Sequence, residues 1–416
     1  MERFLYTISM ILVCATTIPV FAQKDTALED YLTLAKENSP LLNDYNNQRY
    51  SLKIDSMKLR ADYGIHVTGM GDLSAAPLIH NWGYNGGTLN SGRNLDAVVR
   101  ISKDLLGNKN LNTRLAKYSL EMKQVTNQSR ISEVQLSKAV TEQYINTYST
   151  QQKYAVAQEV VQLLEQEDLI LKELTRKATF KQTDYLSFKV TLQQNVLAMQ
   201  QQYADWQNNY ATLNYLVGRV DTTLHRLQAP LLPTGQPAPF SRSMYAEGYK
   251  TDSLKLTNEA RIINYDYQPK LSVYVDGGYS SALTAAPYKN FGTSAGISLT
   301  VPIYDGNKRK KALQQNRLAQ NTRKDYNDFE HQQYQQQTAQ IEGQIRLYKQ
   351  MLTTAEEQLN YAQTLIKANL EQLPTGDVKV ADFILSINNY INLKSGLVQY
   401  QTTLNNLYNQ LQNLTL

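Results

Sequence analysis

The two longest stretches that lack helix-breaking residues constrain the fold of this 416-residue chain more than any other feature. Neither glycine nor proline occurs between Gly107 and Gly218, and only Gly343 occurs between Gly306 and Pro374. Because glycine and proline both destabilise helix interiors, these stretches predict helices much longer than those of an average globular protein.

Within these stretches the apolar residues recur at alternating steps of three and four residues. This period of about 3.5 residues is typical of a coiled-coil seam, although an amphipathic helix of a soluble bundle would show a similar pattern. Lys189 interrupts the first seam and Ser386 the second. The first seam comprises Tyr185, Leu192, Val196, Met199, Tyr203, Trp206, Tyr210, Leu213 and Val217, and the second Phe383, Tyr390, Leu393, Leu397, Tyr400, Leu404, Leu407 and Leu411.

Short motifs recur in the same order at nearly one spacing, which indicates an internal duplication. Gly107-Asn108-Lys109 returns as Gly306-Asn307-Lys308 about 200 residues later, and Asp184 returns as Asp382. We therefore predict two tandem repeats. The predicted parts are a first repeat at 23–229, a Pro-rich linker at 230–240 that cannot be helical throughout, and a second repeat at 241–416.

Each predicted repeat also contains two runs in which apolar and polar residues alternate, as in β-strands with one apolar and one polar face. Polar loops, Ser74–Arg93 and Ala282–Asn290, separate the two runs of each repeat. The runs are Ile65–Leu73 and Leu95–Ile101 in the first repeat, and Leu271–Tyr279 and Ala295–Val301 in the second.

The predicted order in each repeat is helix, strand, loop, strand, long helix, turn, helix. In the first repeat the helices 27–60 and 183–217 are each about half as long as the helix 108–176. At 1.5 Å per residue the longest helix spans roughly 100 Å. Two short helices placed end to end would therefore run beside the long one.

The first 22 residues are typical of a secretory signal peptide. An apolar run from Phe4 to Val13 follows Arg3, and cleavage is expected after Ala22. Lipid attachment at Cys14 stays open, although Val13 occupies a position where lipoprotein signals carry a small residue. Cleavage after Ala22 would leave the mature chain without cysteine, so we expect neither disulfides nor a thiol site.

Composition and motifs favour a protein that is neither an enzyme nor a nucleic-acid-binding protein. The formal charge of +5 is spread along the chain. The four histidines are scattered without the spacing of metal ligands, and no nucleophile elbow or phosphate-binding glycine loop is present. We expect no catalytic residue, no metal site and no cofactor.

Strands with one apolar and one polar face, in an exported chain, are typical of a transmembrane β-barrel. The runs are close to the length of about ten residues that a tilted membrane-spanning strand needs. Four runs are too few, because the smallest ordinary barrels have about eight strands and an open edge would leave backbone groups unpaired in hydrocarbon. The strands can close a barrel only in an oligomer. A soluble four-stranded sheet packed on helices is the alternative.

The order of several motifs resembles that of the TolC-like outer-membrane efflux and secretion ducts, over nearly the whole mature chain. The most specific segment is Leu299-Thr300-Val301-Pro302-Ile303-Tyr304-Asp305-Gly306-Asn307-Lys308-Arg309, where the returning strand passes into the long helix. The other segments are Ala27-Leu28, Asn38-Ser39-Pro40-Leu41, Leu213-Asn214-Tyr215-Leu216-Val217-Gly218 and Pro269-Lys270-Leu271.

The resemblance implies a mainly α fold with β-strands. Long antiparallel coiled-coil helices would form an α-barrel through the periplasm, and four transmembrane strands per chain would close a barrel in outer-membrane lipid only in a homotrimer. Such a duct receives substrates from an inner-membrane transporter through a periplasmic adaptor protein and performs no chemistry. A soluble periplasmic coiled-coil adaptor or scaffold is the alternative, although an adaptor is expected to carry one helical hairpin rather than two.

The resemblance also places the periplasmic entrance at the two helix turns farthest from the strands. In the family each turn carries a glycine followed six residues later by an aspartate. The second turn keeps this pattern with Gly376 and Asp382, whereas the first has Ala178 and then Asp184. The implied adaptor contacts at these tips are Ala178, Thr179, Lys181, Thr375, Gly376 and Asp377.

The resemblance implies that Asp382 and Asp184 narrow the entrance electrostatically. Both residues also fit ordinary helix starts, where an acid caps the helix or favours its first turn, so the two interpretations stay open. Some family members carry a further acid three residues after the second aspartate, where this chain has Leu385.

Four consecutive basic residues, Lys308–Lys311, begin the second long helix at the expected junction with the strands. Positive charge is unfavourable at a helix N-terminus because of the helix dipole, so a partner is expected. Acidic lipid headgroups would provide one. A solvated helix start is the alternative.

Overall fold

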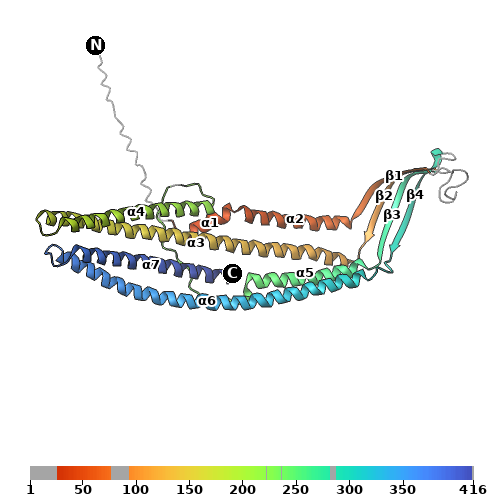
Figure 1. Cartoon of the computed structure of the whole chain (residues 1–416). Helices are drawn as coiled ribbons and strands as arrows, with labels where there is room; N and C mark the ends of the chain where they lie inside the picture. Colours follow the sequence, from red (N-terminus) through yellow and green to blue (C-terminus); the bar gives the residue numbers. More distant parts are fainter. Residues whose placement is uncertain (1–25, 76–92, 222, 236, 282–286, 415–416) are drawn as a thin grey trace, which may run out of the picture. The chain divides into compact units, whose positions relative to one another are not determined.

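The computed structural model describes residues 26–75, 93–221, 223–235, 237–281 and 287–414 (Figure 1). The predicted signal peptide lies outside this range, as do most of the loop Ser74–Arg93 and part of the loop Ala282–Asn290. The helices are α1 (Leu28–Asn38), α2 (Pro40–Asp62), α3 (Asn108–Arg176), α4 (Gln182–Leu216), α5 (Met244–Asp266), α6 (Lys308–Gln372) and α7 (Val380–Leu414). The strands are β1 (Ile65–Ala75), β2 (Arg93–Leu105), β3 (Lys270–Ser281) and β4 (Phe291–Thr300). Short 3-10 helices occupy Phe240–Arg242 and Pro287–Lys289.

The chain divides into two compact units, each made of three segments. The first unit comprises Met1–Thr33, Gln143–Leu231 and Glu357–Gln399, and the second Leu34–Glu142, Leu232–Glu356 and Tyr400–Leu416. Each unit contains parts of both predicted repeats, so the repeat boundaries stay a prediction.

The long helices have the predicted positions, and α3 has the predicted bounds. The prediction of a single helix at 27–60 is wrong, because the chain forms two helices there, α1 and α2, with a break at Ser39. Pro40 lacks the N–H that a continuing helix needs, and the Ser39 side chain instead accepts the N–H of Leu42 at 3.4 Å as an N-cap. None of the described helices is long and apolar enough to cross a membrane.

The core of the first unit is formed where α3, α4, α6 and α7 pack together. Phe188 of α4 and Phe383 of α7 are both fully buried, with ring centroids 6.4 Å apart. The predicted seams contribute Leu192 and Tyr390, whereas Phe188 and Ile387, which the seam pattern missed, are also buried. Both missed residues lie next to a polar interruption of a seam.

Each polar interruption has a partner on a neighbouring helix of the same unit. Lys189 lies 2.9 Å from a carboxylate oxygen of Asp168, and this hydrogen bond raises the pKa of Lys189. Ser386 is buried and accepts a hydrogen bond of 3.0 Å from the Asn369 side chain. The seams therefore tolerate these residues because their polar groups are satisfied.

The four strands form one antiparallel sheet in the order β1-β2-β3-β4, in the second unit (Figure 1). The pairs β1–β2 and β3–β4 are the two predicted hairpins. The pair β2–β3 joins strands from different predicted repeats, and in its register Arg100 lies opposite Asp276. Because of this register, the predominantly apolar faces of all four strands lie on the same side of the sheet.

Candidate functional site

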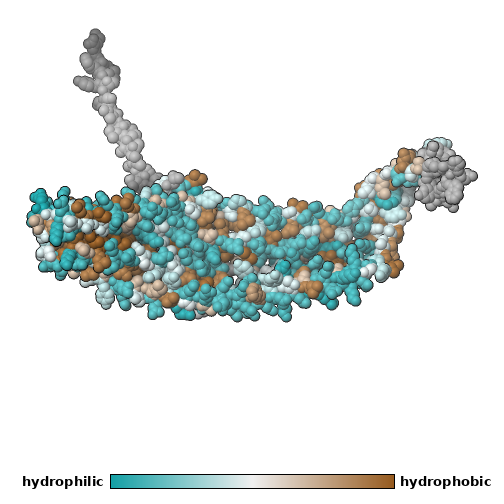
Figure 2. Space-filling model, viewed as in Figure 1, coloured by the Kyte–Doolittle hydropathy of each residue, from teal (hydrophilic) through white to brown (hydrophobic). Residues whose placement is uncertain are grey.

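One face of the sheet is apolar across all four strands. Val67, Ile101 and Val275 lie side by side on this face, as do Leu105, Leu271 and Leu299. Most of these side chains are exposed, and Figure 2 shows apolar groups at the surface of the strand region. A face of this kind is expected to be covered in the working protein, because exposed apolar patches mark sites of interaction with protein or membrane.

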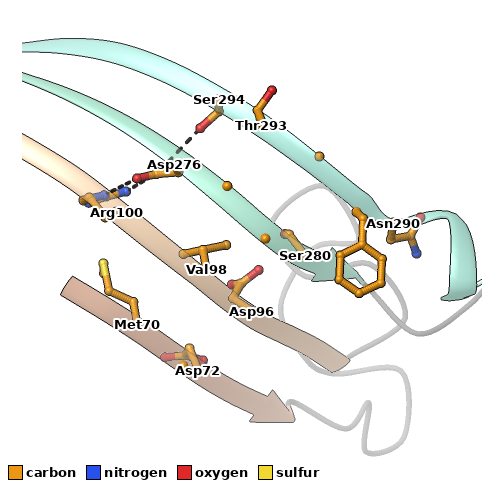
Figure 3. A pocket seen from close by; sticks show the side chains of 15 residues that line it. Met70, Asp72, Asp96, Val98, Arg100, Asp276, Ser280, Asn290, Thr293 and Ser294 are labelled. Carbon is orange, nitrogen blue, oxygen red and sulfur yellow. Dashed lines mark hydrogen bonds and ion pairs between the residues drawn. The ribbon is translucent and has the colours of Figure 1, made fainter. Parts of the chain in front are cut away.

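The opposite face is polar and hollowed. A cavity of about 660 Å³ opens on it, and Figure 3 shows Asp72, Asp96, Arg100, Asp276 and Ser294 around that cavity. The two faces match the outside and the water-filled inside of a membrane barrel wall.

An ion pair joins β2 and β3 on the polar face. The Arg100 guanidinium donates two hydrogen bonds of 2.7 Å to the Asp276 carboxylate, and it lies 4.5 Å from the centre of the Tyr274 ring. The Tyr274 ring in turn covers Gly296 of β4, where a Cβ would lie 2.4 Å from the hydroxyl oxygen. Sequence analysis missed this cluster, although both charges occupy polar-face positions, because the alternation within single strands does not give the register between strands of different predicted repeats.

Both outer strands of the sheet have a free edge within the chain. β1 pairs only with β2, and β4 pairs only with β3, among the described strands. An edge strand of ten residues or more presents a row of unpaired N–H and C=O groups that can pair with another chain.

Two helices of the second unit also expose apolar stripes. α2 has no buried residue, and Tyr50, Ile54 and Met57 are exposed on one side of it. α6 exposes Tyr326 and Phe329. Apolar side chains three and four residues apart on a helix mark a face that packs against another helix, so both helices have contact surfaces that a single chain leaves uncovered.

The two predicted helix turns come together in the first unit. Ala178 has φ +60° and Gly376 has φ +81°, so both adopt the left-handed conformation. A Cβ built on Gly376 would lie 3.9 Å from the Thr179 methyl group. The six predicted contact residues of these turns are all exposed: Ala178, Thr179, Lys181, Thr375, Gly376 and Asp377.

The first turn forms a Schellman motif around Ala178. The N–H of Thr179 donates to the Leu174 carbonyl at 2.9 Å, and the N–H of Ala178 donates to the Thr175 carbonyl at 3.0 Å. Alanine therefore occupies the position that normally takes glycine in this motif. Ala178 thus adopts the same left-handed conformation as Gly376 in the second turn.

Asp184 and Asp382 occupy equivalent positions in the first turns of α4 and α7. The N–H of Asp184 donates to the Lys181 carbonyl at 3.1 Å, and the N–H of Asp382 donates to the Lys379 carbonyl at 3.0 Å. Asp382 is exposed and Asp184 half-buried. Both acids lie where a negative charge favours a helix start electrostatically.

Several solved structures share this architecture, and three of them illustrate the match. The outer-membrane channel OprN matches with a TM-score of 0.76 and 12% identity, over 93% of this chain and 89% of its own. The outer membrane protein VceC of Vibrio cholerae matches with a TM-score of 0.75 and 11% identity, over 93% and 96%. The open state of the MtrE outer membrane channel of Neisseria gonorrhoeae matches with a TM-score of 0.73 and 13% identity, over 93% and 88%.

This chain has the outer-membrane channel fold. No protein-family model and no curated protein matches the sequence, so the fold is recognised through structure at identities of 11–13%. The match extends over both the helices and the sheet, because it covers 93% of the chain. The mainly α architecture predicted from the sequence is confirmed.

The structures that share the channel fold are those of channels and not of enzymes. Three histidines lie in separate surroundings. His66 contacts the Asp62 carbonyl at 2.9 Å, His225 lies 3.5 Å from Asp221, and His331 stacks on Phe240. No group of three metal-ligating side chains occurs among the described residues; His80 lies outside them.

The left-handed turns allow a matched test of the helix tips. Gly376→Ala should destabilise its turn by about 1 kcal/mol, because an L-residue is strained at positive φ. Ala178→Gly should relieve strain and stabilise its turn by less than about 1 kcal/mol, since glycine also makes the unfolded chain more flexible. Hydrogen exchange of the amides flanking each turn measures both effects.

Gly343→Ala is the control, because Gly343 lies inside α6 at negative φ and its Cβ would meet only the end of the Arg346 side chain. This variant should stabilise its helix by about 1 kcal/mol. If Gly376→Ala and Gly343→Ala shifted exchange in the same direction, φ strain would not govern the turn.

Proposed function

We propose that the protein is the outer-membrane channel of a tripartite efflux or secretion system. Three copies close a barrel in the outer membrane, and their helices continue the duct through the periplasm. A periplasmic adaptor protein docks at the helix tips and links the duct to an inner-membrane transporter. The outer-membrane channels that share the fold support this role.

The observation that carries the proposal is the open sheet with one apolar face. Its strands are 10–13 residues long, which suits a membrane crossing, and both of its edges are unpaired within the described part of the chain. Because unpaired backbone groups are costly in hydrocarbon, such a sheet is stable in a membrane only if other copies close it. A soluble adaptor or scaffold would leave this face in water, which disfavours the alternative.

The test is the behaviour of the mature protein in detergent and in planar bilayers. A membrane-extracted trimer that conducts ions supports the proposal. A protein that is monomeric and fully soluble without detergent contradicts it.

We further propose that Asp382 lines the entrance, since it is exposed at the tip of the first unit. Asp382→Asn should reduce block of the conductance by divalent cations from the tip side, because it removes one negative charge per chain from the constriction. Single-channel recording with added divalent cation measures this. Asp184→Asn is the matched variant at the equivalent position of α4. Unchanged block in both variants would remove the acids from the gating role.

A further inference from the structure

A patch at the junction of β4 and α6 combines exposed apolar side chains with positive charge. We name it the junction patch and define it as Ile303, Tyr304, Lys308, Lys310 and Lys311. Ile303 is 95% exposed and Tyr304 85% exposed. The three lysines are also exposed.

The backbone holds the two parts of the patch in one turn. Gly306 and Asn307 are both left-handed, at φ +63° and +64°, so the chain turns sharply between Tyr304 and the start of α6. The Asp305 carboxylate accepts the backbone N–H of Arg309 at 2.8 Å. This bond holds the pKa of Asp305 below its usual value, and the carboxylate is thereby committed to the helix start.

The lysines of the patch have no ion-pair partner among the described residues. Arg309, in the middle of the basic run, donates to the Asn264 side chain at 2.8 Å and 3.1 Å. No such contact involves the side chains of Lys308, Lys310 or Lys311. Like charges repel at this spacing, and the helix dipole adds to the positive potential. An external anion would reduce the repulsion between the lysines and offset the positive potential at the start of the helix.

The apolar face of the sheet indicates where that anion lies. Among the described side chains of the apolar face, only Lys103 is charged. It lies between Ile65 and Val273, near the end of the sheet that adjoins the helices. A lysine at the end of a lipid-facing strand can extend its charge to the headgroups. This end of the sheet is therefore at headgroup level, and β4 leads from it directly into the junction patch.

We propose that the junction patch binds anionic phospholipid of the periplasmic leaflet, with Ile303 and Tyr304 in the interface and the three lysines on the headgroup phosphates. Aromatic side chains favour this interface, and basic residues next to it attract anionic lipid. The inference rests on the proposed function, because it requires the strands to lie in a membrane.

The test uses the full mature protein in phosphatidylcholine vesicles with a trace of spin-labelled phosphatidylglycerol or spin-labelled phosphatidylcholine. The immobilised fraction of each label gives the preference for the anionic lipid. In the triple variant Lys308→Gln/Lys310→Gln/Lys311→Gln the preference for the anionic lipid should fall by a factor of about five or more. A factor of about five is the effect expected for a single lysine near a membrane surface. Added inorganic phosphate should leave the wild-type preference unchanged, which separates lipid from free anion.

Two controls keep the result interpretable. Lys172→Gln/Lys324→Gln/Lys367→Gln removes the same charge from exposed positions on α3 and α6 and should keep the preference. Arginine at positions 308, 310 and 311 keeps the charge and should also keep it. An equal preference in the glutamine variant and the wild type overturns the inference, as does an equal loss in the control triple.

Failure of the inference is distinguishable from failure of the proposed function. The same vesicles, fused with planar bilayers, report conductance. Wild-type protein that conducts without preferring phosphatidylglycerol contradicts the junction patch alone. Protein that neither inserts nor conducts contradicts the channel.

Discussion

A chain carrying Thr68→Cys and Ser298→Cys should form covalent trimers under mild oxidation. Thr68 lies on β1 and Ser298 on β4, the two free edges of the sheet, and both are on the polar face. Successive strands of the sheet run in opposite directions, so in the proposed barrel β4 of one copy would meet β1 of the next in an antiparallel pair. Directly opposed residues in such a pair have Cα atoms about 4.5–5.5 Å apart, which a disulfide can bridge.

Two physical constraints select this register. A shift by one residue would place the apolar face of one strand beside the polar face of the other. Among the registers that keep the faces aligned, the one that sets Thr68 opposite Ser298 also sets Ala75 opposite Phe291, and it pairs all ten residues of β4. Shifts by two residues leave strand ends unpaired, which is costly in hydrocarbon.

The natural sequence makes this experiment clean, because its one cysteine, Cys14, lies in the predicted signal peptide. Non-reducing gels of the membrane fraction measure the product. Thr68→Cys with Ile297→Cys is the control, since these side chains point to opposite faces, and each single variant should stay monomeric on the gel. A second double variant combines Thr68→Cys with Thr300→Cys, the neighbouring position on the polar face. If both double variants stay monomeric on the gel while the protein still conducts, closure of the barrel by β1 and β4 is contradicted.

Local sequence rules were sufficient for the elements but not for their partners. The absence of glycine and proline after Gly107 predicted a long helix that begins at Asn108, the first residue of α3, and period-two alternation located all four strands. The break at Ser39-Pro40 was also predictable from the sequence, since proline cannot continue a helix. The buried position of Phe188 was missed because Lys189 was placed in the seam, and the lysine is tolerated there through its bond to Asp168.

The candidate site depended on information that single-sequence patterns lack. Ala178 shows no sign in the sequence of its left-handed backbone, because alanine seldom adopts that conformation. Only the equivalence with Gly376 suggested the position. The six contact residues at the tips and the gating role of Asp184 and Asp382 remain predictions, since the geometry of one chain supplies no partner for them.

Arg100→Leu should destabilise the protein, because it leaves the Asp276 carboxylate without the guanidinium that donates two hydrogen bonds to it. The remaining contact of that carboxylate is the Ser294 hydroxyl at 3.5 Å. Asp276→Leu should cost less, since the Arg100 side chain is about one-third exposed and can reach water. The double variant should be more stable than Arg100→Leu alone. Thermal unfolding of the detergent-solubilised protein measures the stability of all three variants.

The size of this effect follows from the place of the pair in the sheet. β1 and β2 are consecutive strands, as are β3 and β4, whereas β2 and β3 come from different predicted repeats and are separated along the chain by α3, α4 and α5. A two-residue slip between them would keep the apolar faces aligned, so face alternation alone does not prevent it. The bidentate ion pair between Arg100 and Asp276, which lie directly opposite each other, does prevent this slip. Arg346→Leu, which removes an exposed cation from α6, should change stability by less than about 0.5 kcal/mol. Equal losses in Arg100→Leu and Arg346→Leu would show that the pair does not hold the register.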